Sequence, residues 1–142
     1  MKNAIITITD RHFQDGEEYT CELTTSGSFE ITENGCIVNY IETDEEMTNC
    51  HTKLTVEGSQ KITMTRTGKY NTEMIIEKDR RHLCCYTTPY GELMMGIYAK
   101  SVINEMGENG GKLSFSYTID FNNTPASENE LIITVVEKIQ EE

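Results

Sequence analysis

The segment FEITENGCIVNY, residues 29–40, indicates the fold most directly. Apolar and polar residues alternate on both sides of Asn34-Gly35. Alternation with a period of two is typical of a strand that buries one face and exposes the other. Asparagine and glycine both tolerate positive φ, so this dipeptide between two alternating runs predicts a tight β-hairpin.

The same alternation continues along nearly the whole chain, in β-branched and aromatic residues separated by threonine, serine, glutamate and lysine. Turn signals such as Asp15-Gly16 and Asn109 to Gly111 interrupt it at short intervals, which predicts about ten consecutive strands. Ser101 to Glu108 is the one segment with a weak helical pattern. Because closure removes exposed strand edges, we predict a single all-β domain over residues 1–142, an antiparallel up-and-down β-barrel. A two-sheet sandwich is the alternative, and residues 137–142 are expected to form a frayed acidic tail.

The composition narrows the classes of partner. A formal net charge of −12 over 142 residues repels phosphate polyanions, so no nucleic-acid partner is expected, and the short basic cluster Lys78, Arg80 and Arg81 is interrupted by Asp79. No window is apolar enough to span a bilayer, and residues 1–10 are too polar for a secretion signal, so no membrane association is expected. Five cysteines without framework spacing suit reduced thiols and predict a cytoplasmic protein.

The stretch HLCCYTTPYGELMMGIY, residues 82–98, predicts a second hairpin. Proline cannot adopt the positive φ that begins a mirror-image two-residue turn, so we expect a wider four-residue loop over Thr88 to Gly91. Counting back from that loop pairs Thr87 with Glu92, Tyr86 with Leu93, Cys84 with Met95 and His82 with Ile97.

In this register His82, Cys84 and Tyr86 face the barrel interior, and Cys85 faces outward. Two adjacent cysteines on a strand cannot both ligate one metal ion, and His82 with Cys84 does not match a dedicated zinc motif. We therefore expect no metal and no cofactor. His82 beside Cys84 or Tyr86 lacks an orienting third group, so no catalytic residue is predicted and the chain is not expected to be an enzyme.

Arg66 continues the inward face of the preceding apolar residues, and a buried guanidinium must find an anion or several acceptors. One interpretation is a structural ion pair, since a four-residue turn from Gly68 to Asn71 would place Arg66 opposite Glu73. The other is a ligand site at a polar end of the barrel interior, holding the carboxylate or phosphate of a small molecule. The ligand-binding residues in that interpretation are Arg66, Tyr40, His82, Cys84 and Tyr86.

Two functional hypotheses follow. The leading one is a non-catalytic barrel that binds a small, partly apolar, anionic or amphipathic ligand in its interior. The alternative is a protein-interaction or oligomerisation module, a homo-oligomer for example, with a barrel filled by side chains. Its contact surface would be an outward apolar patch made of Met74, Ile76, Leu83, Met94 and Tyr98.

Several short motifs, spread over nearly the whole chain, resemble the YwiB-like family of small bacterial proteins. They are Asp15-Gly16, Glu22-Leu23-Thr24-Thr25 with Gly27, Arg66-Thr67-Gly68, Arg81-His82 with Tyr86, Thr88-Pro89-Tyr90-Gly91, Gly96-Ile97, and Ser127-Glu128-Asn129-Glu130-Leu131. The resemblance implies a calycin-like β-barrel, similar in architecture to lipocalins and fatty-acid-binding proteins, in a cytoplasmic protein. It implies no particular activity, substrate or cofactor.

Overall fold

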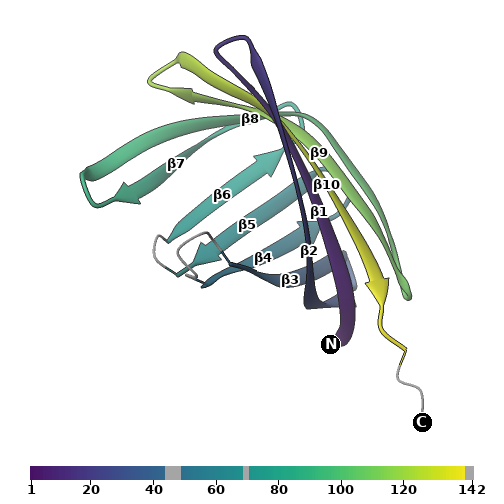
Figure 1. Cartoon of the computed structure of the whole chain (residues 1–142). Helices are drawn as coiled ribbons and strands as arrows, with labels where there is room; N and C mark the ends of the chain where they lie inside the picture. Colours follow the sequence, from purple (N-terminus) through teal and green to yellow (C-terminus); the bar gives the residue numbers. More distant parts are fainter. Residues whose placement is uncertain (44–48, 69–70, 140–142) are drawn as a thin grey trace.

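The computed structural model describes residues 1–43, 49–68 and 71–139, and the side chains of residues 43 and 86–88 lie outside that description. Ten strands follow one another along the chain (Figure 1). They are β1 (Lys2–Gln14), β2 (Glu17–Thr32), β3 (Gly35–Thr43), β4 (Asn49–Glu57), β5 (Lys61–Thr67), β6 (Thr72–Glu77), β7 (Arg81–Thr88), β8 (Gly91–Gly107), β9 (Gly110–Phe121) and β10 (Thr124–Glu137). The predicted acidic tail begins at Glu137, which still pairs with Ala4, and residues 140–142 are outside the described part.

All ten strands belong to one antiparallel sheet, in the order β6-β5-β4-β3-β2-β1-β10-β9-β8-β7. The first and last strands pair in the middle of this sheet, and the sheet curls until its two edge strands, β6 and β7, come together (Figure 1). The resulting ring is nearly closed, because β6 and β7 lie side by side and share the Glu77–Arg80 bridge in place of a ladder. This confirms the predicted all-β, up-and-down barrel. Among the described residues we find no helix long and apolar enough to cross a membrane.

The hairpin between β2 and β3 confirms the prediction made from Asn34-Gly35, but its turn lies one residue earlier. Glu33 and Asn34 form the turn, while Gly35 already pairs with Thr32. Gly35 has no positive φ. Glycine is needed there for another reason, because a Cβ atom on Gly35 would collide with the backbone carbonyl of Val56 on β4.

The predicted register of the β7–β8 hairpin is confirmed, since Cys84 lies opposite Met95 and His82 opposite Ile97. The expected four-residue loop is wrong, because Thr88 and Gly91 still pair and the turn consists of residues 89–90. Gly91 adopts a φ of 126°, which glycine tolerates, and this lets the strand start directly after the turn.

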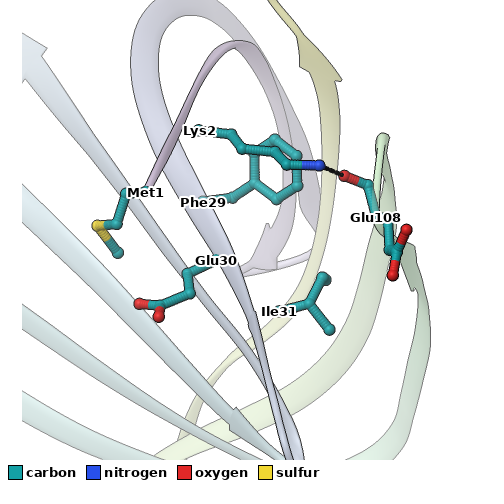
Figure 2. A pocket seen from close by; sticks show the side chains of 6 residues that line it. All are labelled: Met1, Lys2, Phe29, Glu30, Ile31 and Glu108. Carbon is teal, nitrogen blue, oxygen red and sulfur yellow. Dashed lines mark hydrogen bonds between the residues drawn. The ribbon is translucent and has the colours of Figure 1, made fainter.

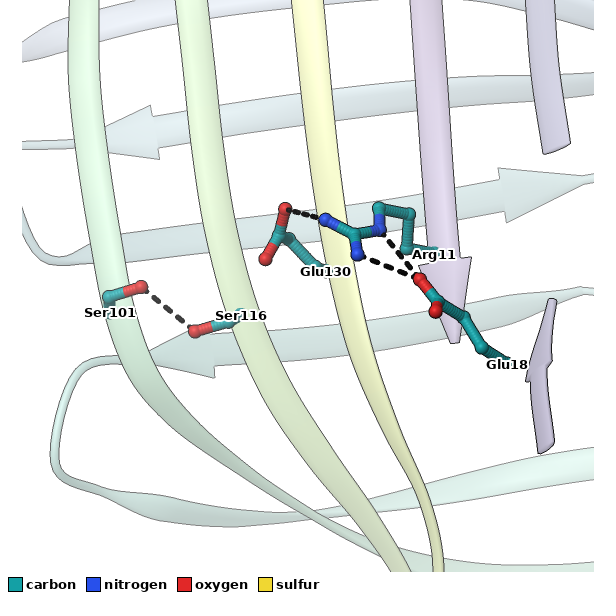
Figure 3. Close-up of polar contacts among 5 residues, drawn as sticks. All are labelled: Arg11, Glu18, Ser101, Ser116 and Glu130. Atoms are coloured by element: carbon teal, nitrogen blue, oxygen red, sulfur yellow. Dashed lines mark hydrogen bonds and ion pairs between the residues drawn. The ribbon is translucent and has the colours of Figure 1, made fainter. Parts of the chain in front are cut away.

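The weak helical pattern at residues 101–108 does not correspond to a helix, because β8 continues as a strand to Gly107. A bulge at Lys100 shifts the pairing with β9. Ala99 and Val102 are therefore both buried although they are three residues apart, and the alternation is broken across the junction. The shift places Ser101 opposite Ser116, where the two hydroxyl oxygens lie 2.8 Å apart (Figure 3).

The inner faces of the strands form one apolar core, which includes Tyr40 and Tyr117. Met74 and Ile76 belong to it, so the expectation that they face outward is wrong. They lie opposite Met64 and Ile62, and cross-strand partners project to the same side of a sheet. The largest fully buried side chains of the core are Tyr40, Phe29, Phe115, Ile6, Leu54, Ile62, Met64, Ile76, Ile97, Leu113, Ile133 and Val38.

Arginine side chains bridge strands on the outer wall. Arg11 lies between two acids, with its Nη2 2.7 Å from the carboxylate of Glu18 and its Nη1 3.7 Å from that of Glu130 (Figure 3). Arg81 donates two hydrogen bonds to Asp120, at 3.0 and 2.7 Å, and lowers the pKa of that carboxyl. Such exposed pairs contribute little to stability.

Candidate functional site

The inner wall changes from apolar to polar along one row of paired residues. Tyr40 on β3 pairs with Thr52 on β4, Thr52 pairs with Arg66 on β5, and Arg66 pairs with Thr72 on β6. Because directly opposite residues project to the same face, all four side chains point toward the barrel interior. This confirms the inward orientation predicted for Tyr40 and Arg66.

Three polar atoms in this row are buried and make no hydrogen bond of good geometry within the described part of the chain, although the Tyr40 hydroxyl does interact with the guanidinium of Arg66. They are the hydroxyl oxygens of Tyr40 and Thr52 and the Nε of Arg66. Tyr40 is 1% exposed and Thr52 is fully buried, so solvent does not reach either hydroxyl from outside. Buried polar groups normally have partners, and an unsatisfied group costs about 1–3 kcal/mol. This row is therefore the candidate for a functional site in the described part of the chain.

Two carboxylates and a further tyrosine interact with Arg66 of this row. Glu42 on β3 lies with its Oε1 3.8 Å from Nη2 of Arg66, whose side chain is about one-third exposed. Asp10 on β1 continues the inward face of Ala4, Ile6 and Ile8 and is half-buried. Tyr117 reaches the same region from β9. We refer to Asp10, Tyr40, Glu42, Thr52, Arg66 and Tyr117 together as the polar end of the barrel.

The pKa shifts in the polar end follow from burial opposed by these charges. Burial raises the pKa of Asp10, while His12 and Arg66 oppose that rise. Burial also raises the pKa of Tyr40, and it raises the pKa of Tyr117 to about 12, so both phenols stay protonated and can donate hydrogen bonds. Burial lowers the pKa of Arg66, but Glu42 and the two tyrosines outweigh it and the net shift is upward, which keeps the guanidinium charged.

The expected ion pair between Arg66 and Glu73 is contradicted by the register. Thr65 lies opposite Glu73, and Arg66 lies opposite Thr72. A displacement of one residue moves a side chain to the other face of the sheet, so Glu73 is exposed on the outer wall. Glu42 takes the place expected for Glu73.

The β7 residues predicted for the site are divided between different surroundings. His82 is half-buried and its Nε2 lies 2.9 Å from Oε1 of Glu77, at the far end of β6 from Thr72. Thr72 and Glu77 are five positions apart along β6, which corresponds to roughly 16 Å. Arg66 lies beside Thr72 and His82 beside Glu77, so the two side chains do not meet. Cys84 is buried and donates its thiol to the backbone carbonyl of Glu73 at 2.8 Å. The side chain of Tyr86 lies outside the described part.

Sequence reasoning missed four members of the polar end. Thr52 lies between Cys50 and Leu54, and every second residue of β4 in this series faces the interior. A threonine among them was not expected to be buried, because threonine is polar and common on the exposed face of strands. Asp10 follows Ile6 and Ile8 at a spacing of two residues. This alternation was the signal in the sequence that could have predicted its inward position. Glu42 and Tyr117 also have inward parity. Their convergence on Arg66 depends on barrel closure, which no local pattern contains.

A separate pocket of about 460 Å³ lies where the start of the chain, the end of β2 and the turn between β8 and β9 come together (Figure 2). It is lined by Met1, Lys2, Phe29, Glu30, Ile31 and Glu108, and none of the predicted site residues borders it. The Lys2 ammonium is already occupied there, donating to the backbone carbonyl of Glu108 at 2.6 Å. No group of three His, Cys, Asp or Glu side chains is placed to hold a metal ion anywhere in the described ranges.

These features define a small antiparallel β-barrel protein with an apolar core and a polar end. The chain belongs to the family described as a domain of unknown function, DUF1934, which matches residues 6–133. Its fold is similar to that of the crystal structure of the YwiB protein from Bacillus subtilis, with a TM-score of 0.85 and 17% sequence identity over 97% of this chain and 93% of the other. The predicted membership in a YwiB-like family of uncharacterised proteins is thereby confirmed. A comparison with curated proteins finds no significant match.

Proposed function

We propose that the protein is a non-catalytic, cytoplasmic binder of a small, partly apolar ligand with an anionic group. Arg66 holds the anionic group, and the hydroxyls of Tyr40 and Thr52 donate to it. The apolar part of the ligand packs against the neighbouring core residues Leu54 and Met64.

The observation that carries this proposal is a row of three buried polar atoms: in the described chain the Thr52 hydroxyl and the Arg66 Nε have no partner, and the Tyr40 hydroxyl lies against the Arg66 guanidinium. Each can donate a hydrogen bond, and a carboxylate or phosphate oxygen accepts several at once. Arg66 is also about one-third exposed, so a molecule can reach it from the mouth of the barrel. Small-molecule sites typically combine an apolar lining with a few convergent polar groups, as this end of the barrel does.

Native mass spectrometry of the protein purified from its producing cells tests the proposal. The wild-type chain is expected to carry an additional bound mass. The Arg66→Met variant is expected to lose it, because removing a charged hydrogen-bond donor weakens binding by about 1.5–3 kcal/mol, or roughly 10- to 150-fold. Arg11→Met removes an exposed arginine of the outer wall and is the matched control that keeps the bound mass. A bare wild-type chain, or an equal loss in both variants, would contradict the proposal.

A second candidate function is self-association through the outer face of the β7–β8 hairpin. Leu83, Met94 and Tyr98 are exposed there by 63, 48 and 37%. Contiguous apolar surface of this kind marks contacts between proteins. Sedimentation at several concentrations distinguishes the two cases: association that grows with concentration and is weakened by Leu83→Ser supports this function, and a monomer at every concentration rules it out.

A further inference from the structure

The first half of β2 is an edge of the sheet. β2 pairs with β1 over residues 17–29, but it pairs with β3 only over residues 27–32. A hydrogen bond of 3.0 Å from the Thr25 hydroxyl to the carbonyl of Ile41 marks where the two strands separate, and the β1–β2 hairpin then turns away from β3 (Figure 1). Within the described chain, residues 17–26 therefore have a neighbouring strand on one side alone. We call these residues the β2 edge.

The register shows which backbone groups of the β2 edge point to its open side. Glu17 and Thr32 close the two-residue turns at the two ends of β2, and such closing pairs are hydrogen-bonded. Hydrogen-bonded and non-hydrogen-bonded pairs then alternate along an antiparallel ladder, and the two described ladders of β2 run without a register shift. The odd-numbered residues thus bond to β1. The N–H and C=O groups that point to the open side belong to Glu18, Thr20, Glu22 and Thr24.

The β2 edge lacks the devices that usually keep edge strands from pairing. Proteins block such edges with lysine, proline or a β-bulge. Residues 17–26 contain no lysine and no proline, and their described ladder with β1 has no bulge. Side chains are also exposed on both faces: Tyr19 and Cys21 on the inner face, and Thr20 on the outer one. An edge of this kind accepts a further strand through main-chain hydrogen bonds.

The charge of the β2 edge decides which strand fits it. Residues 15–22 include Asp15, Glu17, Glu18 and Glu22 and no basic residue. Two copies of the chain joined through this edge would bring their acidic side chains together, and like charges on paired strands are destabilising. A strand that carries lysine or arginine meets the opposite charge, so a basic partner is favoured over a second copy.

We propose that the β2 edge is a docking site for an extended, basic peptide segment of another protein, which adds to the sheet beside β2. Its lysine or arginine side chains lie on the outer face near Glu18 and Glu22. Its apolar side chains alternate with them and pack on the inner face against Tyr19, Cys21 and Leu23. This inference does not depend on the proposed function, because the row of Tyr40, Thr52 and Arg66 belongs to other strands.

Fluorescence anisotropy with labelled synthetic peptides tests the inference. The probe Ac-KVKVKVKVK-NH2 alternates basic and apolar residues. Ac-KKVVKVVKK-NH2 has the same composition without alternation, and Ac-EVEVEVEVE-NH2 has the opposite charge. We expect the wild type to bind the alternating basic peptide about tenfold more tightly than either control peptide.

Variants of the protein locate the binding. Thr20→Pro removes one N–H from the open side and leaves the ladder with β1 intact, so it should weaken binding of the alternating basic peptide about tenfold. Thr20→Ser keeps that N–H and is the matched control, with unchanged binding. Glu22→Lys should weaken binding of the basic peptide and strengthen binding of the acidic one.

Three results would overturn the inference: no binding of the alternating basic peptide, equal binding of the two basic peptides, or binding that Thr20→Pro leaves unchanged. Sedimentation equilibrium without peptide examines the other occupant, since a dimer that Thr20→Pro dissociates would assign the edge to a second copy of the chain. Thermal unfolding confirms that each variant is folded. If Thr20→Pro does not fold, Glu22→Lys and the two control peptides decide the question.

Discussion

Replacing Gly35 by alanine is expected to lower the free energy of unfolding by about 1–3 kcal/mol, as overpacking of a well-packed site does. A Cβ at residue 35 would overlap the carbonyl oxygen of Val56 and lie 2.8 Å from its carbonyl carbon. Both atoms belong to the backbone of β4, so no side-chain rotation can relieve the contact. Gly35 pairs with Glu57 on that strand, and the β3–β4 ladder would have to move apart. Urea denaturation monitored by tyrosine fluorescence measures the change.

Gly107→Ala is the matched control for this substitution. Gly107 also lies at a strand end, and a Cβ there would meet nothing closer than the Gly110 carbonyl oxygen at 3.7 Å. Glycine-to-alanine changes without strain stabilise proteins slightly, by about 0.4–1 kcal/mol, through the unfolded chain. If Gly35→Ala and Gly107→Ala have equal free energies of unfolding, the backbone of β4 at Val56 does not lie as close to Gly35 as the structure places it.

Thr52→Val is expected to change stability in the opposite direction and to raise the free energy of unfolding by about 1–3 kcal/mol. Thr52 is fully buried, and its hydroxyl oxygen has no partner within the described chain. Valine has nearly the same shape, so the variant removes the penalty of an unsatisfied hydroxyl without leaving a cavity. The measurement is urea denaturation of protein refolded without ligand.

Thr25→Val is the control for Thr52→Val. The Thr25 hydroxyl donates to the backbone carbonyl of Ile41 at 3.0 Å, so the same chemical change should destabilise the protein there. If threonine-to-valine substitution raises the free energy of unfolding at residue 52 and lowers it at residue 25, the Thr52 hydroxyl is retained for binding at the expense of stability. Destabilisation by Thr52→Val would mean that its hydroxyl already has a partner in the ligand-free protein.

Side-chain parity explains how much of the fold could be predicted from the sequence. Alternation identifies the inner face of each strand, and it correctly oriented Tyr40, Arg66 and Cys84. It fails where a bulge shifts the alternation, as at Lys100. For this reason the second half of β8 was not predicted as a strand. Alternation also gives no loop lengths, and an error of one residue after β5 placed Arg66 opposite Glu73 instead of Thr72.

The candidate site was only partly predictable because its members come from strands far apart in the chain. Arg66 and Tyr40 are linked through Thr52 by two ladders, which parity can suggest. Asp10 on β1 is close enough to Arg66 for their charges to interact, and this depends on the curl of the sheet, which no local pattern contains. His82 was assigned to the same site from its parity alone, whereas its position along β7 places it beside Glu77.

We propose that the row formed by Tyr40, Thr52 and Arg66 binds a small molecule. A crystal structure of the protein purified from its producing cells, at a resolution that distinguishes water from larger molecules, tests it most directly. We expect continuous non-protein density larger than a water molecule, within about 2.7–3.2 Å of the Arg66 Nε and at least one of the two hydroxyls. Isolated waters that satisfy all three atoms, with no larger density, would contradict it.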